Sequence, residues 1–152
     1  MRRKDKEISE ISDMIAILKK ATVCRLGMVN GDKPYVVPLC FGFQDDVLYF
    51  HSALKGQKID CIRNNPNVCF ELDRIAEPKE SEDPCSWGMT YQSVIGFGKA
   101  AFVEDSDEKH KALNLIMGQY SDQQFQFPQN KVKAMAIIKV EIESMTGKQS
   151  GF

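Results

Sequence analysis

The segment from Val36 to Asn65 constrains the fold of this chain more than any other. Residues 36–43 are apolar and begin with β-branched side chains, and residues 44–46 (Gln-Asp-Asp) have the composition of a turn. Residues 47–50 are again apolar and aromatic, so the first half of the segment predicts a β-hairpin. Two lysines and two isoleucines then recur at helical spacing over residues 55–62. We therefore expect a hairpin that leads, through a polar His-Ser step, into a short basic helix.

The junction between the second strand and this helix has the features of an anion site. A helix that starts where a strand ends exposes free backbone N–H groups and the positive end of the helix dipole. The junction also carries the hydroxyl of Ser52, as a possible cap, and the ammonium groups of Lys55 and Lys58. This combination suits a phosphate monoester. A plain hairpin followed by a solvated basic helix explains the same pattern, and these residues alone leave both interpretations open.

Pro38 lies within the first strand and cannot donate a hydrogen bond to a neighbouring strand. We expect the sheet to be interrupted or to have an edge there, which frees the backbone groups of Leu39 and Cys40. A flat heterocycle with a donor–acceptor edge can use those groups while its phosphate lies near Ser52 and Lys58.

Composition limits the class of protein. The 152 residues allow one domain, residues 1–152, and a formal net charge of −1 gives no overall field that attracts nucleic acid. No apolar run reaches the ~20 residues of a membrane span, and the charged amino terminus lacks a signal core. The five cysteines form no CxxC pair, and only two histidines are present. We therefore expect reduced thiols, no metal site and a cytoplasmic protein without nucleic-acid or membrane partners.

The whole chain predicts a mainly β fold, a barrel of about six antiparallel strands with three flanking helices. A small barrel has little interior room, so a large flat ligand needs an outer groove, which a dimer interface supplies. The expected strands lie at residues 23–28, 36–43, 47–50, 68–73, 87–103 and 134–142. The expected helices lie at 8–18, with Ser9 or Ser12 as cap, at 55–62, and after Asp105 or Ser106. Residues 74–86 read as a long charged excursion.

Six stretches carry a resemblance to a known family. They are MRRKDKEI (1–8), CRLGMVNGDKPYVVPLCFGF (24–43), LYFHSALKGQKID (48–60), NNPNVCFEL (64–72), YQSVIGFGKA (91–100) and the TGK (146–148) that ends the last strand. With these motifs in this order, the chain resembles the flavin-binding split β-barrel proteins related to pyridoxamine 5′-phosphate oxidase, in the nitroimidazole-resistance (Nim) branch. The resemblance covers nearly the whole chain.

The resemblance implies a homodimer with two FMN molecules in clefts between the subunits. By this resemblance, the edge of the isoalloxazine is lined by the backbone of Pro38, Leu39 and Cys40. The phosphate is held, or the ring is flanked, by four side chains: His51, Ser52, Lys58 and Lys55. The partner subunit contributes Tyr91 and Ser93, and Trp87 lies near the ring or the substrate.

Two departures from the oxidase itself bear on function. The strand VVPLCF lacks the flanking Arg and Lys that hold flavin phosphate in the vitamin B6 enzyme, and the Trp-and-Arg ending that serves its substrate is missing. We therefore expect an FMN-dependent oxidoreductase of another kind. It would pass electrons to a nitroaromatic (nitroimidazole-type) or other small flat acceptor, with NADH or NADPH as a transient donor.

His51 is the candidate catalytic residue, because it can supply a proton during reduction. A strand-end histidine that binds a backbone carbonyl is the simpler alternative. Two other functions stay open: a flavin- or haem-binding protein without turnover, in which His51 binds a porphyrin, and a structural dimer with an empty cleft.

Overall fold

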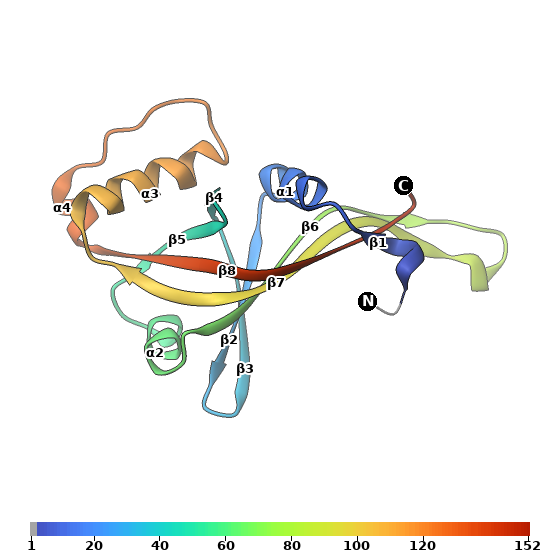
Figure 1. The fold of residues 1–152 in the computed structure, drawn as a ribbon, viewed down its shortest axis with the longest axis horizontal. Helices are drawn as coiled ribbons and strands as arrows, with labels where there is room; N and C mark the ends of the chain where they lie inside the picture. Colours follow the sequence, from blue (N-terminus) through green and yellow to red (C-terminus); the bar gives the residue numbers. More distant parts are fainter. Residues whose placement is uncertain (1–2) are drawn as a thin grey trace.

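A computed structural model describes residues 3–152, apart from the side chain of Ile75 (Figure 1). Its helices are α1 (Ile11–Lys20), α2 (Gln57–Asn64), α3 (Ser106–Gly118) and α4 (Gln129–Lys133), with 3₁₀ turns η1 (Lys4–Lys6) and η2 (Pro84–Ser86). Its strands are β1 (Glu7–Ile8), β2 (Cys24–Asn30), β3 (Lys33–Leu39), β4 (Gly42–Gln44), β5 (Val47–Ala53), β6 (Asn67–Lys79), β7 (Gly88–Val103) and β8 (Met135–Ser150).

The strands form one antiparallel sheet in the order β3-β2-β6-β7-β8-β5-β4, and β1 pairs with β8. The two longest strands, β7 and β8, cross the middle of the molecule in Figure 1. Helix α1 contacts β6, β7 and β8, α2 contacts β2, and α3 contacts β4 and β5. The predicted mainly β, antiparallel architecture with flanking helices is confirmed.

The predicted numbers of elements were too low. The described residues hold eight strands rather than about six, and four α-helices rather than three. The expected strand 36–43 is two strands, because Cys40 and Phe41 are not in strand conformation. The interruption therefore follows Leu39 and does not fall at Pro38. Helix α1 begins after Glu10, which gives it no side-chain cap, so the expected serine cap was wrong.

The first part of the charged excursion at residues 74–86 is strand, and its last part includes η2. Strand β6 continues to Lys79 and pairs with the start of β7, with a register shift between Arg74 and Glu77. The end of β8 continues this ladder, since Tyr91 pairs with Ser150. The resulting arm (residues 74–88) extends beyond the rest of the sheet (Figure 1).

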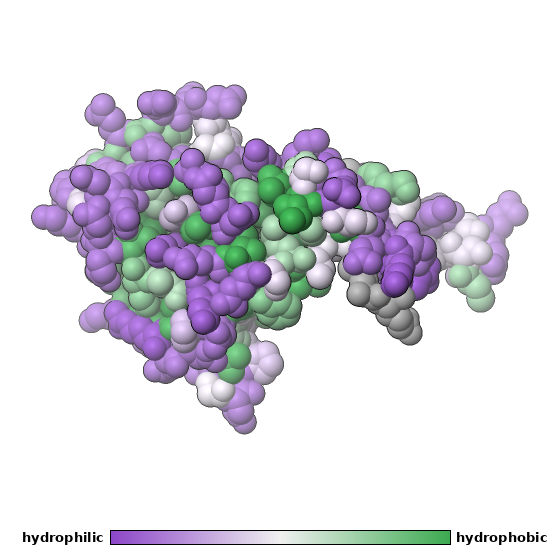
Figure 2. All heavy atoms as spheres, in the orientation of Figure 1, coloured by the Kyte–Doolittle hydropathy of each residue, from purple (hydrophilic) through white to green (hydrophobic). Residues whose placement is uncertain are grey.

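The sheet curls around a core that joins all its parts, with Leu26, Phe50, Phe70 and Ile138 fully buried. A smaller cluster beneath α3 and α4 is centred on Ile137. Hydrophobic side chains also gather on the surface near the middle of the face in Figure 2, between hydrophilic regions over α3 and at the opposite end.

The ladder between the two longest strands contains a bulge. The register of β7 against β8 shifts between Phe97 and Gly98. A Cβ atom on Gly98 would lie 2.2 Å from the carbonyl oxygen of Glu141, so only glycine allows this close approach of two backbones.

Candidate functional site

The junction between β5 and α2 leaves the amino terminus of the helix without a side-chain cap. Gly56 is the N-cap residue, and its φ of 128° is a conformation that other residues rarely adopt. Ser52, the predicted cap, remains in β5, where it pairs with Ala136. The predicted exit from the strand at His51 was therefore too early. The first N–H groups of α2 are open to a ligand.

Lys58 lies in the first turn of α2, beside these N–H groups. Its side chain is half-buried, and burial lowers the pKa of its ammonium group. None of the ion pairs within residues 3–152 includes it. Lys55 precedes the helix and is exposed. A partly desolvated ammonium group at a helix amino terminus is suited to a phosphate.

Alternate residues of β5 face two different environments. Leu48 and Phe50 are fully buried in the main core. Tyr49 packs against the cluster beneath α3, and His51, two residues on, faces the same side. His51 is exposed, and no side-chain hydrogen bond involves it in the described part of the chain. Its imidazole is therefore available to a ligand.

Beside His51 lies an apolar cavity of about 270 Å³, bounded by β5, β8, α3 and the connector between α3 and α4. Its lining residues are Cys40, His51, Leu113, Ile116, Met117, Tyr120, Phe127 and Met135. The structure thus brings together two of the predicted site residues, Cys40 from the break after β3 and His51 from β5.

The end of β3 reaches this cavity at Cys40. Pro38 pairs with Arg25 and Leu39 with Cys24, so Leu39 is still part of the ladder, while Cys40 follows the strand. Strand β3 is an edge strand, as Pro38 predicted.

The residues predicted to act from a partner lie elsewhere in the protomer. Tyr91 and Ser93 are half-buried on β7 near the arm, and the ammonium of Lys148 lies 5.9 Å from the centre of the Tyr91 ring. Trp87, in the loop at the outer end of the arm, is 53% exposed, and its indole N–H donates to the carbonyl oxygen of Ser81 at 2.6 Å. Within one protomer, none of these three residues lines the cavity beside His51.

The outer face of the sheet carries large apolar side chains without cover in the described protomer. Val36, Ile95 and Phe97 are 59%, 46% and 56% exposed on β3 and β7. A groove of about 310 Å³ crosses this face between β2, β3 and the Phe97 ring. Contiguous exposed apolar surface of this kind is typical of an interface.

A charged cluster lies on the same face. The guanidinium of Arg25 donates to Glu71 at 2.9 Å and to Asp73. Burial raises the pKa of the Glu71 carboxyl although Arg25 acts in the opposite direction. Arg25 is held by two carboxylates and is not free to bind a phosphate.

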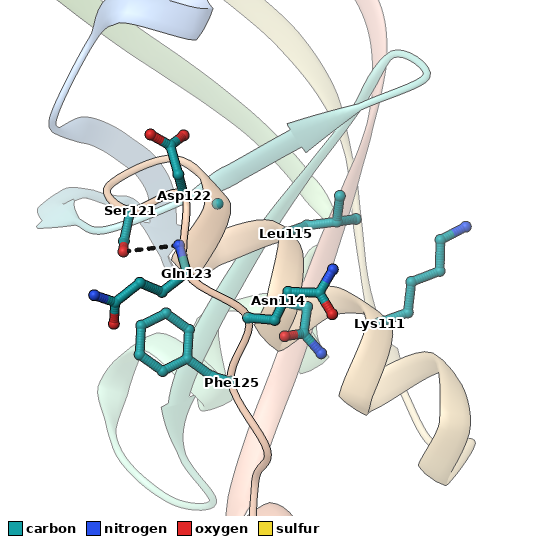
Figure 3. A pocket seen from close by; sticks show the side chains of 9 residues that line it. Lys111, Asn114, Leu115, Ser121, Asp122, Gln123 and Phe125 are labelled. Atoms are coloured by element: carbon teal, nitrogen blue, oxygen red, sulfur yellow. Dashed lines mark hydrogen bonds between the residues drawn. The ribbon is translucent and has the colours of Figure 1, made fainter.

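A wider depression of about 560 Å³ lies between α3 and the connector (Figure 3). Its lining is mostly polar, and the backbone N–H of Gln123 donates to Ser121 at 3.2 Å. The side chains of Lys111, Asp122 and Gln123 diverge in Figure 3, so no group of them converges on one point. None of the predicted site residues lines it.

Sequence reasoning missed the residues of α3 and the connector that enclose the cavity. The aromatic Phe127 and Tyr120 in an otherwise polar stretch are the signal that could have indicated a buried surface there.

Two further properties concern all the residues that the structure describes. Within residues 3–152, no helix combines the length and the apolar character needed to cross a bilayer. In the same range no group of three His, Cys, Asp or Glu side chains is placed to hold a metal ion.

Comparison with known proteins identifies the family. Residues 10–149 match the family described as pyridoxamine 5′-phosphate oxidase, and the chain belongs to it. A candidate 5-nitroimidazole antibiotic resistance protein from Bacteroides thetaiotaomicron is 34% identical, with a TM-score of 0.85 over 93% of this chain and 85% of that one. The predicted split β-barrel fold and the resemblance to the nitroimidazole-resistance branch are confirmed.

Two other proteins share the fold alone or match less of the chain. The FAD and haem binding protein from Mycobacterium smegmatis is 14% identical, with a TM-score of 0.87 over 97% of this chain and 74% of that one. An uncharacterised protein from Rhizobium meliloti is 31% identical over 64 residues, which are 42% of this chain and 42% of that protein.

Proposed function

We propose that the protein is an FMN-dependent oxidoreductase that reduces a nitroaromatic or other small flat acceptor. The observation that carries this proposal is the uncapped amino terminus of α2, with half-buried Lys58 in its first turn, at the end of the strand that bears His51. The similarity at 34% identity to a candidate nitroimidazole-resistance protein supports the acceptor class.

The residues present fit the phosphate end of FMN. Three backbone N–H groups at the start of α2 and the Lys58 ammonium offer donors and positive charge to one phosphate group. Ser52 and Lys55 lie within four residues of Gly56 in the chain and complete the polar surroundings. The backbone at Pro38, Leu39 and Cys40 would line the ring edge.

When bound, FMN supplies the hydride and electron chemistry that no side chain of this protein offers. The protein's own residues hold the phosphate, orient the acceptor and exclude water. In our proposal the imidazole of His51 donates a hydrogen bond, and a proton, to the polar group of the acceptor as it is reduced. NADH or NADPH would be the transient source of electrons.

We infer a homodimer in which the outer sheet face of each protomer covers that of its partner. Val36, Ile95 and Phe97 then become buried. The arm brings Trp87, and the adjoining part of β7 brings Tyr91 and Ser93, toward the partner's cofactor. The apolar character of this face supports this arrangement, as does the fact that Trp87, Tyr91 and Ser93 do not line the cavity of their own protomer. The five free cysteines support a reducing, cytoplasmic location.

A second candidate function is a flavin- or haem-binding protein without turnover. The exposed imidazole of His51 favours it, since histidine is a common axial ligand of haem iron. A protein of the same fold binds FAD and haem. The absorption spectrum of the purified protein separates the two cofactors, because bound flavin is yellow and bound haem has a Soret band.

Anaerobic reduction tests the proposed function. The protein is loaded with FMN, NADH or NADPH is added, and bleaching of the flavin absorbance is followed before candidate acceptors are added. We expect bleaching, then recovery of the colour when a nitroaromatic compound is added. Failure of FMN to bind would contradict the proposal, and bleaching without reoxidation by any acceptor would favour the binding-only alternative.

A further inference from the structure

We propose that the cavity between β5 and α3 is a binding site for a neutral, single-ring benzenoid molecule that presents one polar acceptor group to His51. The inference rests on the proposed function, because such a molecule would be the acceptor that this site reduces. It goes further in assigning the ring and the polar group of the acceptor to separate parts of the protein.

The size of the cavity limits its occupant. It encloses about 270 Å³. An apolar protein cavity of about 150 Å³ is enough to bind benzene, whereas pockets for drug-sized ligands start near 300 Å³. One ring with a substituent therefore fits. The three fused rings of a flavin, with a polar pyrimidine edge, suit this apolar lining poorly.

The lining offers few polar partners. Five of its eight residues are Leu113, Ile116, Met117, Phe127 and Met135, and the remaining three are Cys40, His51 and Tyr120. The Tyr120 hydroxyl already accepts from the backbone N–H of Phe41 and donates to the carbonyl oxygen of Thr22. His51 is therefore the strongest hydrogen-bonding group left for a ligand.

The walls of the cavity are fixed before any ligand arrives. A ring nitrogen of His110 lies 2.8 Å from the Ser106 carbonyl oxygen, and the other lies 3.4 Å from that of Phe127. The side-chain amide of Gln119 donates to the carbonyl oxygens of Leu18 and Ala21, at 3.0 and 2.8 Å. These contacts tie the connector to α3 and α1, so little conformational entropy is lost when the cavity is filled.

An apolar lining discriminates between ring types. A ring nitrogen that enters the cavity loses its water and finds no donor among the carbon atoms of Leu113, Ile116 and Met117. This difference favours nitrobenzene over a nitroimidazole by about tenfold or more in affinity. Unsubstituted benzene fills the ring site but makes no bond to His51.

The test measures binding of nitrobenzene, 2-methyl-5-nitroimidazole and benzene to the purified protein by titration calorimetry. FMN binding is followed in parallel by absorbance. We expect nitrobenzene to bind at least about tenfold more tightly than the nitroimidazole. Met117→Trp should abolish binding because Met117 lines the cavity and is half-buried, so the larger ring fills the space. Leu115→Trp on the same helix lies outside the cavity and should bind normally.

His51→Leu should keep benzene binding and lose the preference for nitrobenzene over benzene. Equal loss in Met117→Trp and Leu115→Trp, or no binding of any of the three compounds, would overturn the inference. The latter result is also expected if a side chain of a second copy fills the cavity. If the wild-type protein binds FMN but none of the three compounds, the cavity assignment is refuted and the proposed function is not. Arene binding without any affinity for FMN refutes the proposed function and leaves the cavity assignment in place.

Discussion

The hydroxyl of Tyr120 accepts a hydrogen bond from the backbone N–H of Phe41 at 3.0 Å, although the two residues are 79 positions apart. Phe41 is fully buried and follows Cys40, which lines the cavity beside His51. This bond fixes the connector after α3 against the break between β3 and β4. The shape of the cavity therefore depends on it.

Tyr120→Phe should destabilise the protein by about 1–3 kcal/mol, because the Phe41 N–H would lose its partner in a buried position. For a chain of this size each kcal/mol lowers the melting temperature by roughly 2–4 °C. Thermal unfolding followed by circular dichroism measures the change. Tyr35→Phe is the matched control, since no side-chain hydrogen bond of Tyr35 occurs within the described residues. Equal melting temperatures for the two variants would contradict this role for Tyr120.

Lys58→Ala should weaken FMN binding by about tenfold to a hundredfold, because it removes a charge-assisted hydrogen bond to phosphate. Riboflavin, which has no phosphate, should be affected little. Arg63→Ala removes one positive charge from the other end of the same helix, where the guanidinium lies over the Phe102 ring, and controls for net charge. Quenching of flavin fluorescence gives the affinity of the wild type and of each variant for both flavins. Parallel losses for FMN and riboflavin would place the phosphate elsewhere.

The affinity for FMN should fall as the pH rises through the pKa of Lys58. Burial lowers this pKa below its ordinary value of 10.5, and only the protonated ammonium attracts phosphate. The sign follows directly: affinity is full while Lys58 is charged and is lost once the proton leaves. Titrations of FMN between neutral pH and pH ~10 test this, where an ordinary lysine is still largely protonated. Lys58→Arg, which stays charged, should show no decline, and a decline identical to that of the wild type would assign the titration to another group.

Phe97→Glu should convert a dimer into a folded monomer, because a stable interface buries roughly 800 Å² per partner and tolerates an unpaired charge at its centre poorly. Phe97 is more than half exposed in the protomer, so the fold itself should survive. Ile11→Glu changes an equally exposed apolar residue on α1 and should leave the dimer intact. Light scattering gives the mass of each variant. A wild type that is monomeric at all concentrations would end the dimer proposal.

Local chemistry was sufficient to predict the hairpin turn at residues 44–46. Asp45 and Asp46, at φ 51° and 59°, occupy turn positions that favour such residues, and this turn was predicted from composition. The end of β5 was misjudged for the opposite reason. His51 and Ser52 have the composition of a strand end, but they pair with Ile137 and Ala136 near the other end of the chain. Pairing over such a distance leaves no local signal.

The candidate site also has a part that local sequence predicts and a part that depends on distant segments. The basic start of α2 was predictable because strand, glycine and lysines lie within a few residues of one another. The cap was assigned to Ser52 rather than Gly56 because the length of β5 depends on β8. The cavity could not be predicted, since it exists only where α3 and the connector pack against β5.

Two prolines on the outermost strand have a consequence for solubility. Pro34 and Pro38 both lie on β3, at the rim of the sheet, four residues apart and therefore on the same side of the strand. Neither proline has a backbone N–H to donate. Of the three alternate positions 34, 36 and 38, only Val36 therefore offers an N–H to an incoming chain. The rim is thus a poor template for stacking strands from other molecules, which protects the protein against amyloid-like polymerisation at the edge that it leaves uncovered.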